Sequence, residues 1–228
     1  MKKLIGICII TLLALSCQKE NIKVETDLSD NEEVSEMGEK QNVFNLVTIG
    51  NQIWKLKNLN RVTYRNGDTI PRVTDPLQWA NLSTGAWCYY ENKGRNATTY
   101  GKLYNWFAVH DPRGLAPDGW HIPSSTDWEI LLNYLGGGSV AGGKMKDIIY
   151  WHSPNVGATN SSGFSGIPGG FRNFDGTFYS LGYSGNWWCA NAFNTIKSRY
   201  LTLDYSHERA DRDSYKKTYG FSVRCIKD

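Results

Sequence analysis

The chain has 228 residues, with 25 lysine and arginine residues against 22 aspartate and glutamate residues, and a formal net charge of +3. Beyond residue 42 the balance is 20 basic to 14 acidic residues, and these charges are scattered, which argues against a nucleic-acid-binding protein. The cysteines there have no C-x-x-C spacing and no close histidine partner, so we predict no metal site and no cofactor.

The first 17 residues have the pattern of an export signal. A basic start, Met1-Lys2-Lys3, precedes an apolar run from Leu4 to Leu15, and Ser16-Cys17 follows. The run has about a dozen residues, fewer than the ~20 of a membrane-spanning helix. Its end resembles the lipobox of bacterial lipoproteins, although Ala14 stands where Leu is usual. In a lipobox the cysteine thiol receives a diacylglycerol, so we expect Cys17 to be lipidated and to anchor the protein in a membrane. The alternative is a plain secretory signal.

Residues 18–42 are expected to form a solvated, extended tether. They contain eight acidic residues, three lysines and no aromatic residue. A segment of low hydrophobicity and high net charge cannot bury enough surface to offset the entropy that ordering costs. Its start, Gln18-Lys19-Glu20, resembles the charged signal that sends lipoproteins of Bacteroidetes-type bacteria to the outer face of the outer membrane. We therefore expect a surface-exposed protein of the outer membrane.

Residues 43–228 are predicted to form one domain, because they hold all 30 aromatic residues and 21 of the 23 glycines. Its first element is a hairpin over residues 47–59, with Gly50-Asn51 as the turn. A short aromatic strand is expected at residues 86–90. From Thr99 the spacing changes to that of a helix, with one face formed by Tyr100, Leu103, Tyr104 and Phe107.

A second helix is predicted to start after Ser124, because Asp127 follows three places later as a capping pair. Its buried stripe is expected to comprise Trp128, Leu131, Leu132 and Leu135. Gly136-Gly137-Gly138 should end it. Short strands are expected later in the chain, at residues 178–181, 199–203 and 220–226. The pattern predicts an irregular, loop-rich α+β fold with two helices and short antiparallel strands.

Several motifs resemble those of one family, the Fibrobacter succinogenes major paralogous domain. They are Gly101-Lys-Leu-Tyr-Asn-Trp-Phe-Ala-Val109, Leu115-Ala-Pro-Asp-Gly-Trp-His-Ile-Pro123, Pro168-Gly-Gly-Phe-Arg172 and the closing Gly220-Phe-Ser-Val-Arg-Cys225. The resemblance implies a fold similar to C-type lectin-like domains and to formylglycine-generating enzyme, in which the N- and C-terminal strands pair and two helices flank them. It implies no activity, because none is established for the family.

The resemblance also implies a disulfide between Cys88 and Cys225, since family sequences often keep a cysteine in the aromatic strand alongside the closing Arg-Cys. A loop of more than a hundred residues closed in this way would stabilise the fold by up to ~4–5 kcal/mol in the chain-entropy model. Cys189 would then be free. A Cys189–Cys225 pairing and a fully reduced protein are the alternatives.

Signals for catalysis are weak. His110, His121, His152 and His207 form no H-E-x-x-H motif, and His121 is expected to hydrogen-bond loop backbone. The glycine-rich residues 136–143 follow a helix, whereas a phosphate-binding loop precedes one. Formylglycine-generating enzyme uses a pair of cysteines that binds copper, and Cys189 could supply at most one of the two. We therefore do not transfer that activity to this chain.

A binding role is better motivated. Residues 182–191 place aromatic rings, amides and hydroxyls in one expected loop, and a second, charged loop spans residues 205–217. The predicted ligand contacts are Tyr183, Asn186, Trp187, Trp188, Asn191, Arg209 and Arg212. The alternative is that both tryptophans are buried, that only Tyr183 and Asn186 face water, and that the charged segment is a solvated hairpin tip. Calcium-bridged sugar binding is not expected, because the chain has Ser153-Pro154-Asn155 and no Trp-Asn-Asp motif.

We therefore expect a surface-anchored, non-catalytic lipoprotein that presents a lectin-like module to a glycan or a cell-surface protein. The alternatives are an envelope enzyme on a formylglycine-generating-enzyme-like scaffold and a structural component of the cell surface.

Overall fold

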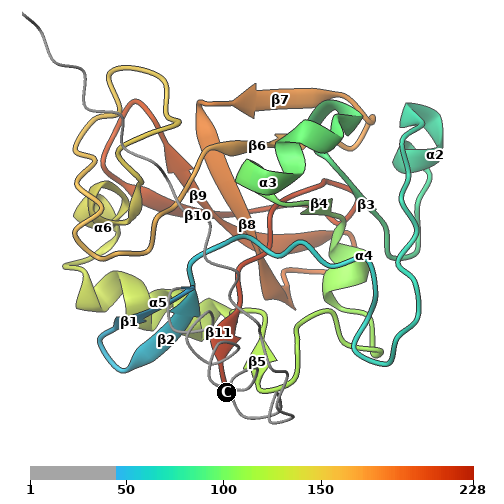
Figure 1. The fold of residues 1–228 in the computed structure, drawn as a ribbon, viewed down its shortest axis with the longest axis horizontal. Helices are drawn as coiled ribbons and strands as arrows, with labels where there is room; N and C mark the ends of the chain where they lie inside the picture. Colours follow the sequence, from blue (N-terminus) through green and yellow to red (C-terminus); the bar gives the residue numbers. More distant parts are fainter. Residues whose placement is uncertain (1–44) are drawn as a thin grey trace, which may run out of the picture. The chain divides into compact units, whose positions relative to one another are not determined.

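The computed structural model describes residues 45–228, which form an irregular α+β fold, as predicted (Figure 1). The expected export signal with its lipidated cysteine, residues 1–17, and the expected tether, residues 18–42, lie outside the described residues. None of the helices in the described part of the chain combines the length and the apolar character needed to cross a membrane.

Within residues 45–228, short strands form three sheets. The first has the order β1 (Leu46–Ile49), β2 (Gln52–Lys55), β11 (Ile226–Lys227) and β5 (Trp120–His121). The second has the order β10 (Ala210–Lys216), β9 (Lys197–Asp204), β8 (Ser184–Ala192), β6 (Gly169–Arg172) and β7 (Phe178–Leu181). The third pairs β3 (Trp87–Cys88) with β4 (Leu103–Tyr104). The pairings between these described strands are antiparallel except that of β6 with β8, which is parallel.

The helices between these strands are short, and the residues described include more of them than the two predicted. They are α2 (Pro76–Ala80), α3 (Ala97–Tyr100), α4 (Trp106–Val109), α5 (Ser125–Tyr134) and α6 (Gly138–Met145), with 3₁₀ turns η1 (Tyr90–Asn92) and η2 (Gly94–Asn96). The two longest, α5 and α6, follow one another directly. They pack against β8 and β10 respectively.

The predicted hairpin is confirmed, with Gly50 and Asn51 between β1 and β2. Gly50 has a φ of 62°, which favours glycine at this turn. The two ends of the domain also pair as expected, because Ile226 of β11 lies opposite Trp54 of β2 on one side and His121 of β5 on the other. The C-terminal strand is therefore held between two strands that come from distant parts of the sequence.

The prediction of one helix from Thr99 through Phe107 is wrong, because α3, β4 and α4 follow one another there. Gly101 has a φ of 74°, outside the helical region, and a side chain there would lie 3.0 Å from the carbonyl oxygen of Leu59. Leu103 then pairs with Cys88 in the third sheet, and a new helix, α4, starts after Asn105. The apolar spacing that suggested a helix reflects burial of a strand followed by a separate helical turn.

The helix predicted after Ser124 is confirmed as α5. The Ser124 hydroxyl accepts from the backbone N–H of Asp127, and the Asp127 carboxylate accepts from the backbone N–H of Ser124. The helix ends before Gly136-Gly137-Gly138, as predicted, and these glycines lead into α6. Gly142 allows this arrangement, because a Cβ there would lie 2.2 Å from the carbonyl oxygen of Arg209.

The segment expected to be a binding loop, residues 182–191, is largely strand β8, which lies inside the five-stranded sheet (Figure 1). Most of the expected charged loop is also a strand, β10, paired along its whole length with β9. The predicted strand at residues 220–226 is mostly a series of isolated bridges, made by Gly220, Phe221 and Ser222, and only Ile226 belongs to a strand.

The disulfide expected between Cys88 and Cys225 is not formed. All three described cysteines are free and buried, and each belongs to a different hydrophobic cluster. Cys88 packs with Val73 and Trp79, whereas Cys225 packs with Leu59 and Val223. Cys189 lies in another cluster than Cys225, and the alternative Cys189–Cys225 pairing is not formed either.

Candidate functional site

Trp187 and Trp188, predicted to contact a ligand, have no exposed surface. The indole N–H of Trp187 donates to the Asn58 side-chain oxygen at 2.8 Å, and that of Trp188 donates to the backbone oxygen of Tyr104 at 2.8 Å. Both rings are buried because they lie on β8, which is packed on both faces. Neither ring can act as a stacking platform, and the prediction is corrected in favour of the alternative that both are scaffold.

Asn186 is also buried, at 5% exposure, contrary to both interpretations of the sequence. Its amide donates to the Ser184 hydroxyl at 2.9 Å and to the Gly170 carbonyl at 3.4 Å. The second bond joins β8 to its neighbour β6. Tyr183 is 40% exposed and its ring stacks on His152, with 4.3 Å between the ring centres. Of the residues at the start of β8, Tyr183 alone keeps an accessible ring.

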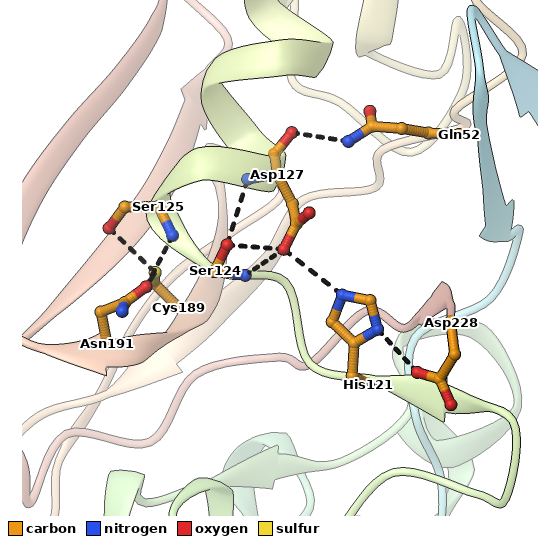
Figure 2. Close-up of polar contacts among 8 residues, drawn as sticks. All are labelled: Gln52, His121, Ser124, Ser125, Asp127, Cys189, Asn191 and Asp228. Carbon is orange, nitrogen blue, oxygen red and sulfur yellow. Dashed lines mark hydrogen bonds and ion pairs between the residues drawn. The ribbon is translucent and has the colours of Figure 1, made fainter.

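The other end of β8 meets the start of α5 (Figure 2). The side-chain oxygen of Asn191 accepts a hydrogen bond of 2.7 Å from the backbone N–H of Ser125. The Ser125 hydroxyl lies 3.3 Å from the sulfur of Cys189, and this thiol also donates to Asn191 at 3.4 Å. Asn191, predicted as a ligand contact, therefore joins the strand to the helix.

A pocket of about 320 Å³ opens beside this junction. It lies between α5 and the strands β8, β9 and β10, and we call it the α5 pocket. Its lining residues are Ser125, Trp128, Glu129, Cys189, Arg199, Tyr200, Arg212 and Asp213. The volume falls in the range of small-ligand sites, ~300–1,000 Å³. Of the predicted contacts, Arg212 lines the pocket, whereas Arg209 pairs with Asp211 at 3.4 Å and does not.

The strand register brings two arginines to the same face of the sheet. Arg199 lies opposite Ser214, and Arg212 lies opposite Leu201. Because side chains alternate along a strand, both arginines share the face of Leu201, which belongs to the same core cluster as Trp128 of α5. Tyr200 and Asp213 are paired on the opposite face by the same alternation. The two guanidinium groups therefore approach the pocket from neighbouring strands.

The two arginines differ in how far their charge is neutralised. Arg212 lies 3.8 Å from the Glu129 carboxylate, at the outer limit of an ion pair, and both side chains are about half exposed. Arg199 has no ion-pair partner among the described residues, and its guanidinium lies 5.1 Å from the ring centre of Phe193. The pocket therefore offers one loosely paired cation and one unpaired cation.

Burial affects the protonation of the thiol at this site. Burial raises the pKa of the Cys189 thiol, so the sulfur at the floor of the pocket stays protonated near neutral pH and is a poor nucleophile. Tyr200 also lines the pocket, but the register places its side chain on the opposite face of the sheet, in the core that contains Trp188. The thiol is therefore the group whose environment disfavours ionisation.

A second polar cluster lies at the N-terminus of the same helix (Figure 2). The Asp127 carboxylate accepts from the Ser124 hydroxyl at 2.6 Å and lies 3.3 Å from the His121 ring, whose other nitrogen lies 2.8 Å from the Asp228 carboxylate. His121 thus contacts two carboxylates, where the sequence predicted loop backbone. The Ser124 hydroxyl is directed to the carboxylate and has no bond to the histidine, so the cluster does not have the order of a hydrolytic triad.

Residues 45–228 contain no group of three or more histidine, cysteine, aspartate or glutamate side chains placed to hold a metal ion. Sequence reasoning missed Ser125, Glu129 and Arg199 as pocket residues. The strand predicted at residues 199–203 is confirmed as part of β9, whereas Ala210–Lys216 has no alternation of polar and apolar residues that would identify β10. The register that joins Arg199 to Arg212 has no sequence signal.

Comparison with known proteins finds one similarity. The model of the Fibrobacter succinogenes major domain family matches residues 47–227, nearly all of the described residues. No curated protein and no solved structure matches the chain.

Proposed function

The chain belongs to the Fibrobacter succinogenes major domain family, and we propose that it is a surface-anchored lipoprotein whose domain binds a glycan or protein ligand without catalysing a reaction. The sequence up to Cys17 supports the lipid anchor, and Gln18-Lys19-Glu20 supports a location on the outer face of the outer membrane. Acyl chains at ~0.8 kcal/mol per buried methylene would hold the protein on the outer membrane.

The observation that carries the binding role is the unpaired Arg199 in the α5 pocket. A cation whose described contact is the Phe193 ring and not a carboxylate, next to a hydroxyl and a second arginine, is a group available to a ligand. The pocket is built from the rigid elements α5, β8, β9 and β10, which suits a preformed site.

An enzyme on the same scaffold is less well supported. The side chain in the pocket best suited to attack a substrate is the Cys189 thiol, and its raised pKa works against that role. The Ser124–Asp127–His121 cluster has its serine directed to the carboxylate. Neither arrangement supplies an activated nucleophile.

The proposal is tested by presenting the purified full chain, in detergent, to arrays of glycans and peptides. Glu129→Trp would fill the pocket from an exposed position on α5, and we expect it to abolish the binding of any ligand found. Ile130→Trp is the matched control, because Ile130 is the next residue of the helix, is 41% exposed and does not line the pocket. A ligand bound equally by both variants would place the site elsewhere, and the absence of any ligand would argue against the binding role.

A further inference from the structure

We infer that the α5 pocket recognises a sugar acid, with the ligand carboxylate held between Arg199 and Arg212. This inference rests on the proposed binding function and names the class of ligand.

The position of the two arginines supports recognition of a carboxylate. They are diagonal neighbours on adjacent antiparallel strands, a relationship that separates side-chain origins by ~7–8 Å. Two long guanidinium side chains starting at this separation can converge on one carboxylate, and arginine bonds to carboxylates are charge-assisted and directional. Like charges so close repel one another, and Glu129 offsets only part of this through its 3.8 Å contact with Arg212. A bound anion would remove the repulsion.

The remaining lining residues favour a sugar ring over a simple anion. Glu129 supplies an exposed carboxylate that can accept hydrogen bonds from hydroxyl groups, and the Ser125 hydroxyl can donate or accept. A sugar acid combines one carboxylate with several hydroxyls on a single ring, so it can use both kinds of group at once. A side-chain carboxylate of a peptide would use the arginines but has no hydroxyl to offer Glu129. The volume of about 320 Å³ leaves room for a ring beside the charged group.

The test measures binding of three probes to the full chain in detergent by calorimetry: a galacturonic acid oligomer, its methyl ester and an acidic peptide. The ester keeps the ring and its hydroxyls but has no charge. We expect the oligomer to bind, and the ester to bind at least about tenfold more weakly, since one charge-assisted hydrogen bond exceeds the ~1.4 kcal/mol that corresponds to a factor of ten.

Variants assign the effect to residues. Arg199→Gln and Arg212→Gln should each weaken binding of the oligomer at least about tenfold, while Arg209→Gln removes the same charge from outside the pocket and should leave affinity unchanged. All three side chains are exposed, so circular dichroism should show intact folds.

Equal binding of the acid and its ester would overturn the inference and leave the proposed function standing. Binding of the acidic peptide alone would overturn the choice of a sugar. An effect of Arg209→Gln as large as that of Arg199→Gln would show attraction by overall charge and would also overturn the inference. Failure of every probe and of the arrays described above would count against the proposed function itself.

Discussion

Trp187 and Trp188 are adjacent in the chain, yet their side chains belong to different hydrophobic cores on opposite faces of β8. Trp187 packs edge-on against Phe164, with ring centres 5.8 Å apart, in the cluster that contains Trp128 of α5. Trp188 packs against Phe221 at 4.4 Å in the cluster that contains Trp106. A pair of tryptophans that looks like a binding motif therefore joins the two main cores of the domain.

Replacing either tryptophan by alanine should lower the free energy of unfolding by ~3–5 kcal/mol, because each change removes a fully buried ring and leaves a cavity. Chemical denaturation measures this loss. Tyr183→Ala is the control, since its ring is 40% exposed and its loss should cost far less. A tryptophan variant with wild-type stability would contradict the burial described here.

Cys17→Ser should abolish acylation, because the diacylglycerol is carried on the thiol. The measurement is metabolic labelling with a palmitate analogue, followed by separation of the labelled proteins. Cys8→Ser, in the same leader segment, is the matched control and should leave labelling intact. If Cys17→Ser is labelled as strongly as wild type, the lipoprotein proposal is wrong.

Alkaline pH should destabilise the domain partly through Cys88. Burial raises the pKa of this thiol from 9.0 to about 12 in the folded protein. The folded state therefore keeps a proton that the unfolded chain loses, so this contribution to stability is complete below pH 9 and is lost as pH rises towards 12.

Cys88→Ala removes this titration. The variant should be less stable than wild type at pH 7 because of its cavity, but the difference between the two should shrink as pH rises above 9. Denaturation at pH 7, 9 and 10.5 measures the change. A constant difference across this range would show that the thiol does not titrate as described.

Arg224 should be essential for stability although it does not line the α5 pocket. Its guanidinium is fully buried and donates to the backbone oxygens of Lys55 at 3.0 Å and Phe164 at 2.8 Å, and to the Asn58 side chain at 3.1 Å. Arg224→Lys keeps the charge but loses the planar set of donors. We expect a loss of at least ~1–3 kcal/mol, because lysine leaves one or more of these buried acceptors without a donor.

Equilibrium unfolding measures the effect, and Arg209→Lys, at an exposed position, is the matched control. Near-identical stability of both variants would show that the buried hydrogen bonds of Arg224 contribute little. The same logic applies to Arg172, which is buried and donates to the backbone oxygens of Val73, Thr74 and Gly176. These contacts give a physical reason for the two arginines in the family motifs Pro168–Arg172 and Gly220–Cys225.

Local interactions made part of the fold predictable from the sequence. The β1–β2 hairpin is encoded by its Gly50-Asn51 turn, and α5 by the reciprocal capping of Ser124 and Asp127, so both lie where the sequence placed them. The strand at residues 178–181 also has the predicted bounds. In each case the determining residues are within a few positions of one another, and their local preference agrees with the final fold.

Long-range contacts decided the remainder. The helical spacing from Tyr100 to Phe107 was overridden because Gly101 must pass close to Leu59 and because Leu103 pairs with Cys88. The aromatic run around Trp187 has the composition of a binding loop, and nothing in the local sequence reveals that it is covered on both faces. Whether β8 is buried depends on which other elements pack on its two faces, and the residues of those elements are spread over the whole chain.

The candidate site divides in the same way. The sequence by itself determined the family, the aromatic composition of the domain, and Tyr183 and Arg212 as accessible side chains. Only the tertiary structure decided that Arg199 stands beside Arg212, facing Ser125 and Glu129 of α5. The physical reason is strand register: a shift of one residue between β9 and β10 would turn one arginine to the opposite face. That register is fixed by packing of Leu201 and Tyr200 into two separate cores.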